Sequence, residues 1–153
     1  MVRTFQGYVP RTSDTVLGLG MSAISSTRRM FWQNQGELVP WESAIVGGHL
    51  PLHRGIALDK DDQLRRAVIN DLMCDGTVEL GPIATRFDIS APAYFARELA
   101  ELTGMPDLAH YDASANAIRT TPMGKLLVRN VCMLFDRYAR PVTAEAPRFS
   151  STI

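Results

Sequence analysis

The chain has 153 residues, about the length of one domain and enough to bury a hydrophobic core. Apolar residues make up 46% and charged residues 21%, a composition that excludes a disordered chain. The 16 Lys and Arg balance the 16 Asp and Glu, so a nucleic-acid partner is disfavoured. Because no apolar run is long enough for a bilayer and the first residues lack a signal-peptide pattern, we predict a cytoplasmic protein without a membrane partner.

The cysteines and histidines do not form a recognisable metal site. Cys74 and Cys132 lie far apart in the sequence, and neither belongs to a C-x-x-C motif. His49 and His53 are separated by Pro51, which breaks any helix that could align them as ligands. Two cysteines alone cannot hold an iron–sulfur cluster. We therefore expect two free, buried thiols and no metal on this chain.

Residues 1–58 hold most of the glycines and both tryptophans, and they show few helical patterns. One short strand is predicted over residues 14–20, and a second over residues 5–9. Gly18 and Gly20 indicate a point where the backbone approaches another segment closely. The third glycine of a dinucleotide-binding fingerprint is missing after them, so a Rossmann fold is disfavoured.

Residues 59–140 are expected to be almost entirely helical. Asp59 caps a helix that runs to about Cys74 and is closed by Gly76. A short helix follows over residues 82–86, and another begins near Pro92. The apolar stripes of the first and third of these helices are Leu64, Ala67, Val68 and Leu72, and Phe95, Leu99 and Leu102.

The end of this region predicts a hairpin followed by one long helix. Residues 108–111 and 117–120 bracket a turn-forming segment. Thr121 then caps a helix that continues to Arg140, and residues 141–153 form an extended tail. The expected stripe of this helix is Leu127, Val131, Leu134 and Tyr138. With Leu72, Phe95, Val131 and Leu134, Leu127 is predicted to lie in the core, where Leu127→Ala would cost about 2–5 kcal/mol.

The predicted fold is therefore mainly α. It is a winged-helix-like helical domain with a small β-hairpin, preceded by a Gly-rich segment that carries one or two strands without partners. This order of elements also suggests an alternative function, a winged-helix module that binds DNA or protein. The candidate recognition helix, residues 91–101, offers Arg97 but also Glu98 and Glu101, which disfavours contact with phosphate groups.

Several strings, in this order and approximate spacing, resemble one enzyme family. They are Phe5-Gln6-Gly7-Tyr8, the segment from Leu17 to Ser25, Gln33-Asn34, the segment from Arg54 to Leu58, Arg65-Arg66 with Val68-Ile69, and the segment from Gly124 to Met133. Together they are similar to the carboxy-terminal third of the oxygen-independent coproporphyrinogen III oxidases, also called coproporphyrinogen III dehydrogenases. The resemblance covers nearly the whole chain.

The resemblance implies a radical S-adenosylmethionine oxidoreductase of haem and porphyrin biosynthesis. The family oxidatively decarboxylates coproporphyrinogen III to protoporphyrinogen IX, with a 4Fe–4S cluster and S-adenosylmethionine. The three cysteines for its cluster lie in an amino-terminal barrel, and their C-x-x-x-C-x-x-C motif is absent here. We therefore expect residues 1–58 to be a remnant of the end of a truncated α/β barrel and residues 59–140 an accessory domain. The missing barrel domain is the expected partner, and the chain alone is expected to be inactive and to hold no cofactor.

The resemblance also supplies candidate site residues. In the family, the residues that match Phe5, Gln6 and Ile24 touch a second S-adenosylmethionine molecule; from physics alone, Phe5 and Ile24 are interior barrel residues. We expect no closed pocket and no measurable affinity without the rest of the barrel. Arg129, Asn130 and Asp136 are either anchors to the barrel or a solvated helix face. Trp32 and Trp41, on either side of Gln33-Asn34, either pack a loop or bind a ring ligand. The resemblance leaves open a role for this segment as a lid on the path to the substrate cavity.

Overall fold

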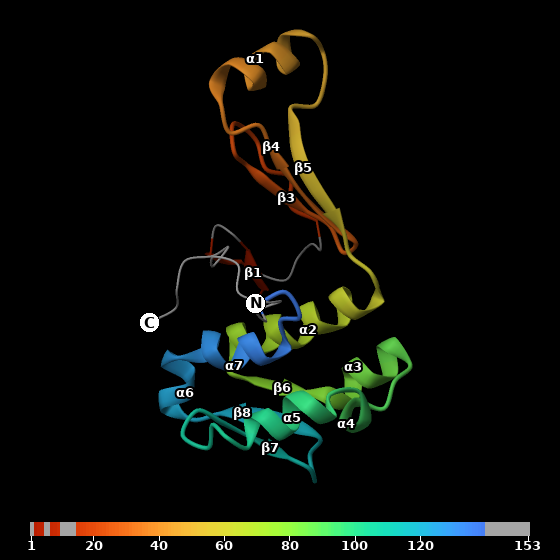
Figure 1. Ribbon diagram of the computed structural model, residues 1–153, viewed down its shortest axis with the longest axis vertical. Helices are drawn as coiled ribbons and strands as arrows, with labels where there is room; N and C mark the ends of the chain where they lie inside the picture. The colour runs from red at the N-terminus through yellow and green to blue at the C-terminus, as the bar shows by residue number, and fades with distance from the viewer. Residues whose placement is uncertain (1, 5–6, 10–14, 140–153) are drawn as a thin grey trace, which may run out of the picture. The chain divides into compact units, whose positions relative to one another are not determined.

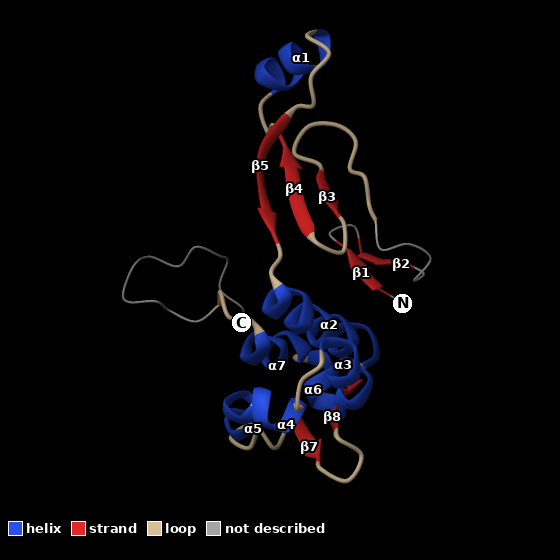
Figure 2. Ribbon diagram, turned by 90° about the vertical axis from the view of Figure 1, so that its right-hand side faces the viewer, coloured by secondary structure: helices blue, strands red, loops and turns tan. Residues whose placement is uncertain are grey.

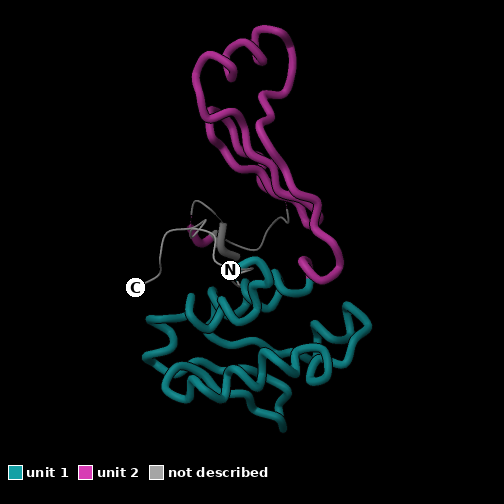
Figure 3. The backbone as a smooth tube through the Cα atoms, in the orientation of Figure 1, with its two compact units in different colours: residues 1–3, 64–153 teal, residues 4–63 magenta. Residues whose placement is uncertain are grey.

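The computed structural model describes residues 2–4, 7–9 and 15–139. The chain divides into two compact units (Figure 3). Unit 1 comprises Met1–Arg3 and Leu64–Ile153, and unit 2 comprises Thr4–Gln63. No helix in the described part of the chain is long and apolar enough to cross a membrane.

Unit 2 is built on an antiparallel sheet of three strands in the order β3 (Ile24–Ser26), β4 (Met30–Asn34) and β5 (Leu52–Ala57). The connection between β4 and β5 contains α1 (Leu38–Val46), which lies beyond one end of the sheet (Figure 1). Two short strands, β1 (Val2–Thr4) and β2 (Gly7–Val9), lie near the start of the chain.

The sheet of unit 2 differs from the predicted strands. Of the strand expected over residues 14–20, only Val16 pairs, through a single bridge to Ser26, and Asp14 lies outside the described residues. Extended pairing ends there because the segment turns at Gly20, whose φ is +98°. Strands β3, β4 and β5 and helix α1 were not predicted from the sequence. Strand β5 is exposed along its whole length, so it shows no alternation of buried and exposed residues that the sequence could reveal.

Unit 2 has little core of its own. Its described buried residues are Ser25, Ser26, Asn34, Pro51 and Asp62, and none of these is a large apolar residue. Its exposed large apolar side chains are Tyr8, Leu17, Leu19, Met21, Met30, Leu38, Val39, Ile45, Val46, Leu50, Leu52 and Ile56. So much exposed apolar surface is unusual in a free-standing domain and is typical of a surface that packs against another body.

Helix α2 (Lys60–Asp75) has the predicted ends. The Asp62 amide donates to Asp59 Oδ1 at 2.8 Å, and the Asp59 amide donates to Asp62 Oδ2 at 3.1 Å. This reciprocal capping box satisfies two amides at the start of the helix. The helix is followed by Gly76, whose φ of +70° is the left-handed conformation that glycine accepts at a helix end.

The rest of unit 1 packs short helices around a small antiparallel sheet (Figure 2). The helices are α3 (Leu80–Phe87), α4 (Ala91–Tyr94), α5 (Ala96–Leu102), α6 (Pro122–Leu126) and α7 (Val128–Phe135). The strands are β6 (Thr77–Glu79), β7 (Ala109–Asp112) and β8 (Ala117–Thr120), in the order β6-β8-β7. The hairpin of β7 and β8 was predicted, whereas β6 and its pairing with β8 were not.

The fold of unit 1 corrects the prediction of one long helix to Arg140. The helix breaks at Leu127, whose φ of −105° and ψ of 29° are not helical, so α7 starts with a new phase. Leu127 is therefore 38% exposed and Tyr138 53% exposed, whereas Phe135 is fully buried in their place. Val131 and Leu134 are buried as predicted, as are Leu72 and Phe95.

A largely buried ion pair joins three helices of unit 1. Arg65 Nη1 in α2 donates to Glu98 Oε1 in α5 at 2.9 Å and to the Phe135 carbonyl in α7 at 3.2 Å. The Glu98 side chain is only 3% exposed and that of Arg65 14%. The guanidinium also lies 5.6 Å from the centre of the Phe95 ring. Because both charges are largely withdrawn from water, removing one partner would leave the other with much weaker compensation.

Candidate functional site

Of the three residues expected to touch a cofactor, the structure places one. Ile24 is half-buried and begins β3, at the start of the sheet of unit 2. Phe5 and Gln6 lie outside the described residues. Their proximity to Ile24 therefore stays a prediction.

Ile24 is held in place by the glycine loop that precedes it. A Cβ on Gly18 would lie 2.8 Å from the Ile24 carbonyl oxygen, so only glycine fits there without a shift of backbone. The Gly18 amide donates to Ser25 Oγ at 2.9 Å, and Asn34 Nδ2 donates to the Gly20 carbonyl at 2.9 Å. The predicted close backbone approach is confirmed for Gly18 but not for Gly20, where a Cβ would meet nothing within 4 Å. The buried Asn34 carboxamide fastens the loop to β4.

The strand register places Ile24 beside two polar residues. Ile24 is opposite Gln33, and Gln33 is opposite Arg54. In the same way Ser26, Phe31 and Ile56 form a second row. Residues directly opposite each other, and every second residue along a strand, share one face of a sheet. We call the face formed by Ile24, Ser26, Phe31, Gln33, Arg54 and Ile56 the Arg54 face.

Gln33 fixes the direction of the Arg54 side chain. Arg54 Nε donates to Gln33 Oε1 at 2.9 Å, and Gln33 Nε2 donates to the Ser22 carbonyl at 3.1 Å. Both the oxygen and the nitrogen of the Gln33 carboxamide are therefore hydrogen-bonded, and the oxygen accepts the Nε–H of the guanidinium. Within the described part of the chain, the two Nη atoms of Arg54 meet no hydrogen-bond acceptor and no carboxylate.

The other candidates from the sequence do not join this face. Trp32 lies opposite Gly55 on the reverse face of the sheet, and Trp41 lies in α1 with its Nε1 buried and without a described partner. Arg129 is exposed on α7, whereas Asp136 follows the end of that helix, where its Oδ1 accepts from the Tyr138 amide. Arg129 and Asp136 therefore do not share a helical face, although their spacing of seven residues would place them on one in a continuous helix.

Neither Cys74 nor Cys132 forms a disulfide, as predicted, but only Cys132 is buried, and Cys74 is half-buried. Among residues 2–4, 7–9 and 15–139, no group of three His, Cys, Asp or Glu side chains could hold a metal ion. The pKa of one carboxyl is lowered in the β7–β8 turn. There the Ser114 hydroxyl donates to Asp112 Oδ1 at 2.6 Å, and with the Ala115 amide it lowers the pKa of that carboxyl.

Comparison with known proteins gives one consistent result. No protein-family model matches the chain. Curated relatives named oxygen-independent coproporphyrinogen III oxidase include those of Escherichia coli, 38% identical over 99% of this chain, and Pseudomonas aeruginosa, also 38% identical over 99%. That of Thermostichus vulcanus is 35% identical over 89%. The chain spans 33%, 32% and 42% of these three relatives, respectively.

A solved structure agrees with the sequence relatives. The coproporphyrinogen III oxidase HemN of Escherichia coli, described as a radical SAM enzyme, superposes with a TM-score of 0.82 at 38% identity. The superposition covers 90% of this chain and 32% of HemN. The chain is therefore a homologue of the oxygen-independent coproporphyrinogen III oxidases that corresponds to about one third of such an enzyme.

Proposed function

We propose that this chain is the carboxy-terminal accessory part of an oxygen-independent coproporphyrinogen III oxidase. The similarity to HemN, with a TM-score of 0.82 over 90% of the chain, carries the proposal. In this role, residues 1–58 complete a radical barrel and residues 59–140 form a winged-helix-like accessory domain. The tail expected over residues 141–153 lies outside the described residues. The assembled cytoplasmic enzyme would convert coproporphyrinogen III to protoporphyrinogen IX.

The exposed apolar surface of unit 2 supports this role. The apolar side chains on α1 and β5 are left to solvent, as expected for part of a larger core whose other side belongs to another segment. Because the described residues offer no metal-ligand group, we assign the 4Fe–4S cluster to the remaining two thirds of the enzyme. Phe5, Gln6 and Ile24 would contribute to an S-adenosylmethionine site only in the assembled enzyme.

The alternative function, DNA binding through α5, has little support in the structure. Glu98 is buried in the pair with Arg65, so this side of α5 faces the core. Arg97 lies 3.6 Å from Glu98 and 3.8 Å from Glu101, so its charge is already partly compensated. A helix with this charge pattern does not favour phosphate.

Co-expression tests the proposal. The chain would be produced together with the two thirds of the Escherichia coli relative that it does not match, with that enzyme's own carboxy-terminal third as positive control. We expect the two pieces to co-purify and, after anaerobic cluster reconstitution, to convert coproporphyrinogen III when supplied with S-adenosylmethionine and a reductant. Neither piece alone should do so. A co-purified complex with a full cluster and no conversion would contradict the proposed role.

A further inference from the structure

We infer that Arg54 binds a carboxylate of the tetrapyrrole substrate and that Gln33 is its positioning residue. This inference rests on the proposed function, since it assigns a role within the substrate site of that enzyme. It begins from the geometry of the Arg54 face, on which one arginine stands among apolar side chains.

The guanidinium is oriented for a two-point contact. Its Nε–H is used by Gln33, whose other end is fixed on the Ser22 carbonyl. The two Nη atoms, which have no described acceptor, are left to donate together. A pair of parallel N–H donors matches the two oxygens of a carboxylate, and such charge-assisted pairs are stronger than neutral hydrogen bonds. Because Gln33 already holds the side chain, less rotational freedom is lost when the ligand binds.

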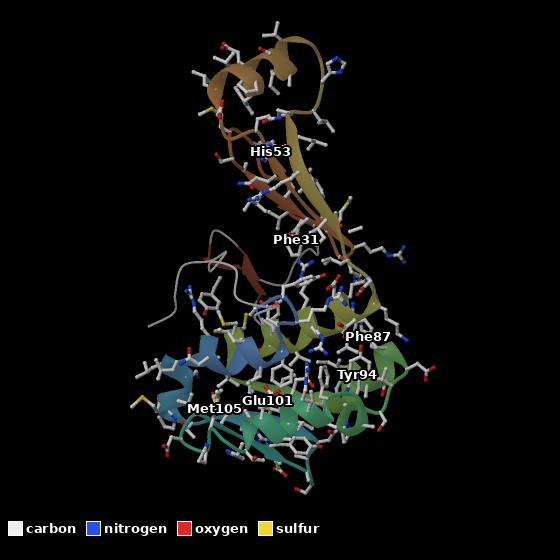
Figure 4. The ribbon with its side chains drawn as sticks, in the orientation of Figure 1. Phe31, His53, Phe87, Tyr94, Glu101 and Met105 are labelled. Carbon is white, nitrogen blue, oxygen red and sulfur yellow. The ribbon has the colours of Figure 1, made fainter. Side chains whose placement is uncertain are left out.

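The surroundings of Arg54 match a ring that carries carboxylates. Phe31 and Ile56 form the next row of the same face, and Ile24 lies in the row of Arg54 itself. Ile56 is 45% exposed, and Ile24 and Phe31 are half-buried. Figure 4 shows Phe31 on the sheet of unit 2. A coproporphyrinogen has apolar pyrrole rings with propionate side chains, so its rings suit the apolar row and one propionate suits Arg54. A purely apolar protein partner would instead bury the guanidinium without a counter-charge, which is costly.

NMR titration of the isotopically labelled full chain with coproporphyrin III tests this inference. The probe is the stable oxidised tetrapyrrole with the same propionates, and NMR detects even weak binding. We expect shifts of the Arg54 Nε–H signal and of the Ile24, Phe31 and Ile56 amides. Arg54→Gln should weaken binding about tenfold, the loss expected for a charge-assisted hydrogen bond. Arg54→Lys keeps the positive charge but lacks the two parallel N–H donors, so it should weaken binding less than Arg54→Gln.

Two controls isolate the role of the carboxylate. Arg29→Gln removes an equally exposed positive charge from the turn between β3 and β4, and it should leave the affinity within about twofold of the parent. A cationic porphyrin without carboxylates should not lose affinity in Arg54→Gln. Equal affinity of Arg54→Gln and the parent for coproporphyrin III, or no shift on the Arg54 face, would overturn the inference. Shifts on the reverse face alone would do the same.

Turnover in the co-expressed complex separates this inference from the proposed function. If the parent complex is active, Arg54→Gln should raise KM with little change in kcat, because the arginine holds the substrate without taking part in the chemistry. An active complex whose KM does not respond to Arg54→Gln would leave the proposed function intact and remove the role of Arg54. An inactive parent complex would contradict the proposed function, and the titration would still decide the role of Arg54 in binding.

Discussion

Substituting alanine for Gly124 should strongly destabilise unit 1. Gly124 is buried in α6, where a Cβ would overlap the carbonyl oxygen of Leu108, an atom of the backbone that cannot rotate away. That carbonyl also accepts the Thr121 amide at 2.9 Å, and the Gly124 amide donates to Thr121 Oγ1 at 2.9 Å. The added methyl group must therefore displace the start of β7, the first turn of α6, or both.

The size of the effect follows from three contributions. Overpacking a buried site costs about 1–3 kcal/mol. Weakening a hydrogen bond of the displaced backbone adds about 1 kcal/mol. Alanine in a helix recovers about 0.5–1 kcal/mol relative to glycine. We therefore expect Gly124→Ala to lower the free energy of unfolding by about 2 kcal/mol.

Gly81 provides the matched control, because it also lies in a short helix, α3, but a Cβ there would meet nothing within 4 Å. Gly81→Ala should be neutral or raise the free energy of unfolding by up to about 1 kcal/mol. Urea unfolding followed by circular dichroism at 222 nm would compare both variants with the parent. If Gly124→Ala is as stable as Gly81→Ala, the close approach of α6 to Leu108 is wrong.

Three further measurements test other parts of unit 1. By the same assay, Phe135→Ala should lower the free energy of unfolding by about 3–5 kcal/mol, and Leu127→Ala by no more than about 1 kcal/mol. The reverse order would support the single long helix predicted from the sequence. Glu98→Gln should cost about 3 kcal/mol because it removes the carboxylate that faces the largely buried Arg65 guanidinium, and a neutral result would mean that this site is hydrated. Ser114→Ala should raise the pKa of Asp112 in an NMR titration. Because its pKa is lowered, the Asp112 carboxylate stabilises the fold above the ordinary value of 3.8, and this stabilisation is lost as pH falls through the folded-state pKa. The free energy of unfolding of Ser114→Ala should therefore depend less on pH in this range. An unchanged pKa would exclude the Ser114 hydroxyl as the cause.

The sequence predicted where some helices begin and end more accurately than it predicted which side chains they bury. Asp59 and Gly76 correctly bounded α2, because caps act through the backbone of the nearest residues. The break at Leu127 could not be anticipated, since the apolar spacing continues through it and only tertiary contacts choose between one helix and two. The same limit explains the misplaced phase that put Leu127 in the core instead of Phe135.

The candidate site was only partly accessible from the sequence. Close backbone approach was predicted at Gly18 and Gly20, and the structure shows it at Gly18, with Ile24 as the neighbour. The Gln33-Asn34 string was recognised in the sequence. Its two hydrogen bonds, from Arg54 to Gln33 and from Asn34 to the Gly20 carbonyl, depend on strand register. Register could not be predicted because β5 is exposed on both faces and carries no hydrophobic alternation.

The distribution of chromophores gives each unit its own optical signal. Both tryptophans, Trp32 and Trp41, lie in unit 2, whereas most of the helical backbone lies in unit 1. Indole emission therefore reports on unit 2, which carries the Arg54 face, and far-ultraviolet ellipticity reports mainly on the helical core of unit 1. Energy transfer from Trp32, which is adjacent to Gln33 in β4, would measure how close a bound tetrapyrrole lies without any added label.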